Sequence, residues 1–213
     1  MPRPPKRKPE RGDARTRLLD AARDVIRAKG FSATSVEELC VAAAVTKGSF
    51  FHHFASKEAL GVAAAQHWAE TTSAFFASAP YHAPDDPLDR VLAYVAFRKA
   101  IISDDLVECT CLVGTMVEEV YVTSTVIRDA CAASIFGHAA TLEGDIELAM
   151  RARGVTGGFT AASLARHTQT VIQGAFVLAK AGNDPALARE GLDHLARYIR
   201  LLFGCPNKES NPP

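Results

Sequence analysis

Residues 46–60 read TKGSFFHHFASKEAL, and this run of three phenylalanines and two adjacent histidines decides how the chain is interpreted. Neighbouring histidines suggest a metal site, whereas clustered aromatic residues suggest a helix packed on a core. On a helix, His52 and His53 point about 100° apart and cannot hold one metal ion together. Neither has a His, Cys or carboxylate three or four residues further along. The sequence therefore favours a packed helix, and we expect neither a metal site nor a cofactor.

The phenylalanines indicate which side of this helix is buried. Phe50 and Phe54 lie four residues apart and share one face, which we expect to pack on the preceding helices. The start of the helix carries free backbone N–H groups, which favour a phosphate. Lys57 shares a side with His53 and is predicted to be free to reach a phosphate as a point charge. The face turned away from the core is predicted to hold Thr46, Lys47, Ser49, Phe51, His52 and His53.

Two further helices are predicted before this one. Residues 15–29 carry an apolar stripe, and Gly30 follows them as a left-handed helix end. Thr34 and Ser35 are each followed three residues later by a glutamate, a doubled capping-box signal for a helix to about residue 43. A helix, a short joint and a second helix have the spacing of a helix-turn-helix, whose second helix enters the major groove of DNA.

The stretch TSVEELCVAAAVTKGSFFHHFASKEAL, residues 34–60, resembles the DNA-binding segment of the TetR family of bacterial transcriptional repressors. The shared pattern is a Thr/Ser-capped helix, a short turn, a Thr-Lys-Gly-Ser start, an aromatic run with His-Phe, and Ser-Lys-Glu. The resemblance covers residues 15–61. It implies a homodimer that binds palindromic double-stranded operator DNA and is released by a small-molecule effector. The residues it assigns to DNA contact are Thr34, Ser35, Thr46, Lys47, Ser49, Phe51, His52, His53 and Lys57.

Three positions depart from the family pattern. Ala44 stands where the turn usually has glycine, which we expect a mildly adjusted turn to accept. Phe51 and His52 stand where tyrosines commonly contact phosphates. Phe51 has no hydroxyl, so we expect it to pack on a sugar or a thymine methyl group, whereas His52 can still donate a hydrogen bond.

Composition and charge agree with a globular protein whose N-terminal part is basic. The chain has 213 residues, of which 48% are hydrophobic and 23% charged. Residues 1–60 hold 12 Lys and Arg against 7 Asp and Glu, and residues 61–213 hold 12 against 17. No run approaches the ~20 apolar residues of a membrane span, and no apolar run follows the basic N-terminus as a signal peptide requires. We therefore expect a cytoplasmic protein with no membrane partner. Its five cysteines, an odd number, are expected to be reduced.

The predicted fold class is all-α, with about nine helices, no strand, and a larger helical domain after the helix-turn-helix. The helices expected after the opening stretch cover 56–78, 86–102, 109–120, 124–153, 161–181 and 186–203. The predicted domains are a disordered basic tail (1–12), a DNA-binding domain (13–60), a ligand-binding and dimerisation domain (61–205) and a C-terminal tail (206–213).

The last two helices are expected to form the dimer interface, because the family pairs them with their mates as a four-helix bundle. The alternative is that their apolar faces form only an internal core. The residues predicted at the interface are Leu164, Val171, Gly174, Leu178, Leu192, Leu195 and Ile199.

The effector site is predicted among the helices from 86 to 181, with Trp68 at its edge. The segment CTCLVGTMVEEVY (109–121) is similar to a segment of the electrophile-sensing N-ethylmaleimide reductase repressor subgroup of that family. This similarity implies an alternative release by modification of the thiol of Cys111. The competing interpretation is that Cys111 is a buried core residue. The candidate ligand contacts are Trp68, Phe97, Cys111, Tyr121, Phe136, His138 and His167.

Two function classes other than a repressor are alternatives for this sequence. One is a helical thiol enzyme with Cys111 as nucleophile and His138 or His167 as base. The other is a helical interaction module that does not bind DNA. No base stands at a recognisable spacing from Cys111, and an enzyme does not need the pattern at 34–60, so we do not expect an enzyme.

Overall fold

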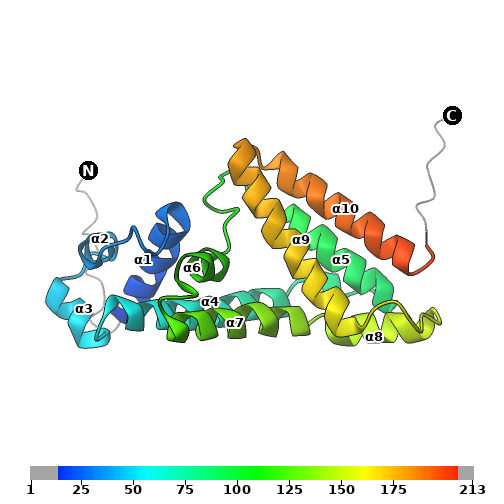
Figure 1. Cartoon of the computed structure of the whole chain (residues 1–213), viewed down its shortest axis with the longest axis horizontal. Coiled ribbons are helices and arrows are strands. Elements are labelled where there is room, and N and C mark those ends of the chain that lie inside the picture. Colours follow the sequence, from blue (N-terminus) through cyan, green and yellow to red (C-terminus); the bar gives the residue numbers. More distant parts are fainter. Residues whose placement is uncertain (1–13, 206–213) are drawn as a thin grey trace, which may run out of the picture.

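The computed structural model describes residues 14–205, and within this range the chain forms ten α-helices, one 3-10 helix and no strand (Figure 1). The all-α prediction is therefore confirmed. The predicted tails, residues 1–12 and 206–213, lie outside the described residues. No helix between residues 14 and 205 has the length and apolar character needed to cross a membrane.

The N-terminal unit consists of α1 (Ala14–Lys29), α2 (Val36–Ala42) and α3 (Lys47–His53). Ser35 caps α2 in a capping box, in which its side chain accepts from the N–H of Glu38 and Glu38 accepts from the N–H of Ser35. Thr46 caps α3 by accepting from the N–H of Ser49. These caps fix where each short helix begins, so the start of α3 follows from its own sequence.

The joint between α2 and α3 contains Ala44 in the left-handed region, with a φ of 51°. The turn therefore has the left-handed conformation that suits glycine. The side chain of Ala44 makes this conformation sterically unfavourable, by a free energy of about 1–2 kcal/mol. Gly30, which ends α1, has a φ of 92° and confirms the predicted left-handed helix end.

The remaining helices form an elongated body beside this unit (Figure 1). They are α4 (Lys57–Ala77), the 3-10 helix η1 (Pro80–His82), α5 (Pro87–Ala100), α6 (Leu112–Val120), α7 (Thr125–Ala140), α8 (Glu143–Ala152), α9 (Ala161–Gly182) and α10 (Ala186–Leu202).

The helix predicted over 124–153 is divided into α7 and α8, which raises the count from nine to ten. The break lies at Thr141 and Leu142, whose N–H groups bond to the carbonyls of His138 and Ala139, three residues back. This tighter pattern ends α7 and lets Leu142 turn into the core. Gly137 and Gly144, the two glycines of this stretch, lie inside α7 and α8 and do not mark the break.

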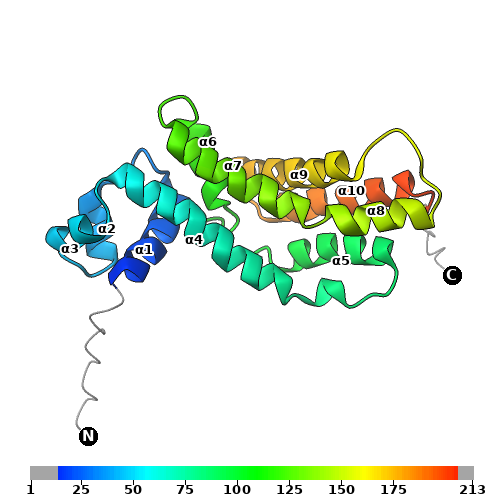
Figure 2. The same ribbon diagram turned by 90° about the horizontal axis from the view of Figure 1, so that it is seen from below.

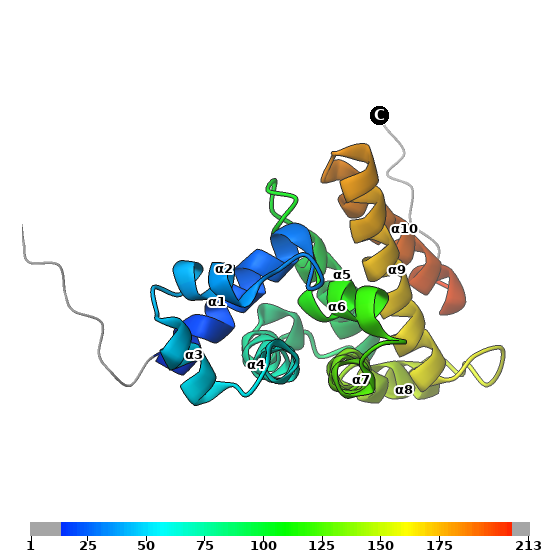
Figure 3. The ribbon, with the colours of Figure 1, turned by 60° about the vertical axis from the view of Figure 1, so that its left-hand side comes forward.

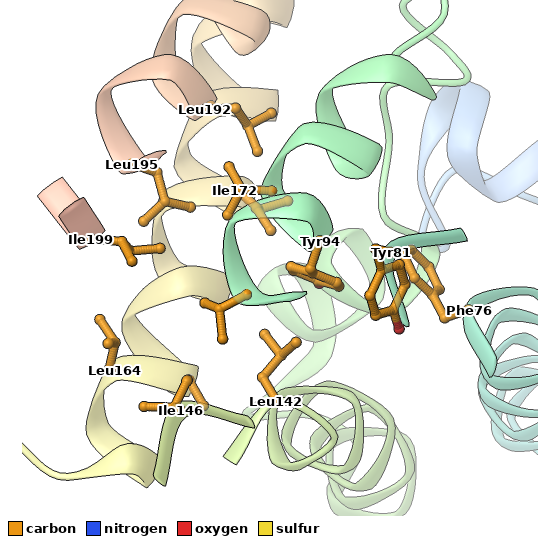
Figure 4. Packing of buried hydrophobic residues seen from close by; sticks show 14 of the residues in the cluster. Phe76, Tyr81, Tyr94, Leu142, Ile146, Leu164, Ile172, Leu192, Leu195 and Ile199 are labelled. Atoms are coloured by element: carbon orange, nitrogen blue, oxygen red, sulfur yellow. The ribbon is translucent and has the colours of Figure 1, made fainter. Parts of the chain in front are cut away.

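Two clusters of buried residues hold the molecule together. The first joins α1–α3 to the N-terminal half of α4, to α6 and to the start of α7. The second joins the C-terminal end of α4 to α5, α8, α9 and α10, and its packing is shown in Figure 4. Since α4 contributes to both clusters and runs between the two parts (Figure 2), it connects the N-terminal unit mechanically to the rest.

Candidate DNA-binding face and ligand cavity

The exposed side of α3 brings together most of the residues predicted to touch DNA. Phe50 and Phe54 are buried against α1 and α2, as their spacing predicted. Phe51 is 51% exposed, and its ring lies edge-on to that of Phe50, 5.2 Å away. A short helix held by two buried rings presents a fixed outer face, and a B-DNA major groove is wide enough to admit it. The other exposed or half-buried members of this face are Thr46, Lys47, Ser49, His52 and His53.

The charge of Lys47 is partnered within the chain. Its ammonium group bonds to the carboxylate of Glu37 on α2, and both side chains are more than half exposed. This bond lowers the pKa of Glu37 and raises that of Lys47. Because exposed ion pairs contribute little stability, a phosphate or a base edge can displace Glu37 at small cost.

Two residues predicted to contact DNA are bonded within the chain instead of being free. Thr34 is only 2% exposed, and its hydroxyl donates to the carbonyl of Gly30 at 2.6 Å, so it cannot reach a phosphate and does not cap α2. The ammonium group of Lys57 is not free, because it donates to the carbonyls of Phe31 at 2.9 Å and Thr34 at 2.8 Å. It also lies 4.5 Å from the centre of the Phe31 ring. Lys57 thus fixes the loop after α1.

A cavity of about 340 Å³ lies within the helical body, and Arg27 of the N-terminal unit reaches its wall. Of the seven predicted ligand contacts, Trp68, Cys111 and His138 line it. Most of its wall is apolar and comes from α4, from α7, from α9 and from the segment between α5 and α6. The apolar lining consists of Trp68, Phe75, Phe76, Ile101, Ile102, Val113, Ile135 and Phe176.

The other four predicted ligand contacts do not line the cavity. Phe97 lies in a second layer, packed on Phe75 and Phe76 with ring centres 5.5 and 5.7 Å away. Tyr121 and Phe136 are exposed at the surface, because each points away from the buried face of its helix. His167 lies on the exposed side of α9 against Tyr198.

The sequence interpretation missed two arginines of the cavity wall, Arg27 on α1 and Arg98 on α5. A signal for Arg98 was present, because it falls on the buried stripe of α5 four residues after Tyr94 and three after Val95. A charged residue on an apolar stripe calls for a partner. Arg27 could not have been found in this way, because its contacts lie more than 80 residues away in sequence.

A buried polar chain lies at one end of the cavity. Gln169 donates an N–H to the hydroxyl of Tyr94 at 3.0 Å, and that hydroxyl bonds to Nε2 of His138 at 2.9 Å. Burial, with a smaller contribution from the charge of Arg98, lowers the pKa of His138 to about 4. His138 is therefore neutral at neutral pH, and its Nε2 accepts the proton of Tyr94.

The thiols near the cavity are Cys109 and Cys111. Cys109 is buried, and burial raises its pKa. Cys111 is half-buried and is the N-cap residue of α6. Cys131, inside the first cluster, has its pKa raised to about 12 by burial and is therefore an unreactive thiol at neutral pH.

Four of the residues predicted at a dimer interface are wrong, because the chain itself covers them. Leu192 and Leu195 of α10 point toward Ile172 of α9 (Figure 4), and Leu195 is 2% exposed. The other buried residues of this group are Leu164 and Ile199.

The outer sides of α9 and α10 nevertheless carry apolar residues. Leu178, which was predicted there, is 62% exposed, and Gly174 is exposed beside it, with Val171 half-buried. Four further exposed residues on this outer side are Val177, Leu187, Tyr198 and Leu201. We call these seven residues the α9–α10 stripe.

The family of the chain follows from its N-terminal unit. The model of the bacterial regulatory proteins of the tetR family matches residues 18–64, which include α2, α3 and the start of α4. The N-terminal unit of the chain therefore belongs to the TetR family.

Three relatives show how far this likeness extends. The regulator UidR of Escherichia coli K12 is 46% identical over 46 residues, 22% of this chain and 24% of UidR. The repressor DhaR of Mycobacterium sp. strain GP1 is 33% identical over 118 residues, 55% of this chain and 58% of DhaR. The crystal structure of the reduced form of Escherichia coli NemR superposes with a TM-score of 0.71 at 27% identity, covering 86% of this chain and 95% of NemR. The matched part thus spans about a quarter of UidR and just over half of DhaR, whereas the fold is shared over most of the length.

Proposed function

We propose that this TetR-family chain is a transcriptional repressor that binds operator DNA through α3 and is released by a small molecule in the cavity. The observation that carries the proposal is the outer face of α3, where polar and aromatic side chains are exposed on a helix fixed from beneath by Phe50 and Phe54. Residues 13–60 would then be the DNA-binding domain, and residues 61–205 would bind the effector and a second copy of the chain.

The α9–α10 stripe supports a homodimer. Two helices with exposed apolar residues along one side bury them by packing on the same helices of a second copy. A two-fold dimer presents two copies of α3, and half-sites one helical turn apart, about 34–36 Å or a multiple of it, require a fixed separation of the two. Any effector that changes this separation weakens operator binding.

Substitution of a residue on the exposed face of α3 tests the proposal. Lys47→Ala should lower operator affinity by about 1–3 kcal/mol if Lys47 reads a guanine edge, or reduce the salt dependence by about one unit if it contacts a phosphate. Footprinting on the DNA upstream of the chain's own gene supplies the operator, and fluorescence anisotropy at several salt concentrations measures the affinity.

Lys180→Ala is the matched control, because Lys180 is an exposed lysine on α9, far from α3. It should bind operator as the parent does. If Lys47→Ala and His52→Ala both bind like the parent, α3 is not the DNA-contacting helix. The absence of any footprint would favour a helical module that does not bind DNA.

Release by modification of Cys111 is a second candidate, favoured by the position of this thiol as a half-buried residue of the cavity wall. An adduct on Cys111 would occupy the cavity as a bound effector does. N-ethylmaleimide should then release operator DNA from the parent and from Cys205→Ser at about ten-fold lower dose than from Cys111→Ser. Equal doses for parent and Cys111→Ser would exclude this thiol as the sensor. The thiol-enzyme alternative has no free base at the cavity. Nε2 of His138 is bonded to the hydroxyl of Tyr94, and His167 lies on the surface.

A further inference from the structure

Among the residues that line the cavity, Arg98 indicates most directly that a ligand binds there. Its guanidinium group lies 5.2 Å from the ring centre of Phe76 and 5.9 Å from that of Phe176, and it lines the cavity. Within residues 14–205 it forms neither an ion pair nor a side-chain hydrogen bond, whereas Arg90 of the same helix pairs with Asp145. The two rings are cation–π partners of the guanidinium group, and its N–H groups have no hydrogen-bond partner among the described residues.

The other charges of the cavity do not neutralise Arg98. Arg27 is a second cation, and its Nε donates to the carbonyl of Thr110 at 2.9 Å. Glu108, the acidic residue of the lining, is exposed, and its backbone carbonyl also accepts from Arg27. His138 is neutral, as argued above from its pKa of about 4. The interior of the cavity is therefore an apolar space with an uncompensated positive charge.

We infer that the effector is an apolar organic acid whose carboxylate pairs with Arg98 and whose hydrocarbon part lies against Trp68, Phe75 and Ile135. This inference rests on the proposed function, because it names the class of effector that the repressor binds. A carboxylate accepts two parallel N–H bonds from a guanidinium group, and the N–H groups of Arg98 have no partner among the described residues. The apolar wall accounts for most of the buried surface of such a ligand, and a cavity of about 340 Å³ suits a small one.

Trp68 allows this inference to be tested without DNA, because it is the single tryptophan of the chain and lines the cavity. Quenching of its fluorescence measures the binding of three probes that share a phenylalkyl body and differ in the charge of the head group: 4-phenylbutanoate, 4-phenylbutanamide and 4-phenylbutylamine. We expect the carboxylate to bind at least about ten-fold more tightly than the amide, as a hydrogen-bonded charge pair contributes. The amine should bind more weakly than the amide.

Variants of Arg98 locate this preference. Arg98→Gln should lower the affinity for 4-phenylbutanoate about ten-fold and leave that for the amide within about two-fold. Arg98→Lys, which keeps the charge but not the planar fork, should retain part of the preference for the carboxylate. Arg128→Gln is the control, because Arg128 is an exposed arginine on α7 whose partner, Asp129, is exposed too. A cooperative thermal unfolding transition in each variant would show that the variant is folded.

Each outcome separates the effector class from the proposed function. Equal affinities of the parent for carboxylate and amide, or tightest binding of the amine, would overturn the inference and leave operator binding by α3 untouched. An unchanged preference in Arg98→Gln would overturn it as well. Arg98-dependent binding of the carboxylate in a protein with no operator footprint would support the cavity chemistry and refute the repressor.

Discussion

Leu195→Asp is expected to unfold the protein rather than to separate a dimer. The side chain of Leu195 is almost fully buried between α10 and α9, inside the second cluster (Figure 4). Aspartate at this position would place an unpaired carboxylate in an apolar core and remove the packing of the leucine, at a cost of more than about 4 kcal/mol. Urea denaturation followed by circular dichroism measures this loss of unfolding free energy.

Leu201→Asp is the matched change on the same helix, because Leu201 is 67% exposed and belongs to the α9–α10 stripe. It should leave the helix content unchanged and convert a dimer into a monomer that no longer binds the operator, as sedimentation and anisotropy would report. A folded monomer from Leu195→Asp would show that the partner chain, and not the core, covers Leu195. A dimer of unchanged mass from Leu201→Asp would place the interface elsewhere.

The contrast between Leu195 and Leu201 shows what the periodicity of a single sequence cannot decide. α9 and α10 are apolar on two sides, one for the chain's own core and one for the exposed stripe. The pattern of apolar residues predicted both helices, but it does not indicate which apolar side packs on the chain's own core and which is exposed. On α3 the same reasoning succeeded, because Phe50 and Phe54 alone mark the buried face and every other face is polar or exposed.

The misplacement of Lys57 and the omission of Arg27 share one cause, which is a contact far away along the chain. Lys57 was predicted to reach DNA, and its ammonium group instead bonds to carbonyls about 25 residues earlier. Arg27 was not singled out, and it reaches residues 108–110. Caps such as those of Ser35 and Thr46 were predictable because their partners lie three residues away. Local hydrogen bonds can be read from spacing, whereas long-range ones require the packing of the helices.

Arg27→Met is expected to uncouple effector binding from DNA release. Arg27 belongs to α1, beside α6 in Figure 3, and its guanidinium group bonds to the carbonyls of Glu108 and Thr110, just before α6. It also lies 5.5 Å from the ring centre of Trp68 and lines the cavity. A ligand that displaces the 108–111 segment or Trp68 therefore acts directly on a side chain of the N-terminal unit.

The measurable quantity is the ratio of the affinities of 4-phenylbutanoate for the free protein and for the protein bound to operator. In the parent this ratio should lie between about 5 and 150, the range of typical coupling free energies. Arg27→Met should bring it toward one while changing operator affinity little, because methionine keeps the apolar contact with Trp68 and loses both hydrogen bonds. Arg23→Met is the control, since the partners of Arg23, Asp20 and Asp24, lie on α1 itself.

The outcome decides between two physical routes from cavity to DNA. Besides Arg27, α1 meets α6 through buried side chains, among them Leu19 and Ile26 on α1 and Met116 on α6. Close-packed apolar contacts transmit a displacement without any hydrogen bond. A ratio that stays at the parent value in Arg27→Met would assign the coupling to this apolar contact. A ratio near one would assign it to two hydrogen bonds from one arginine, because Arg27→Met leaves the apolar contact between α1 and α6 in place.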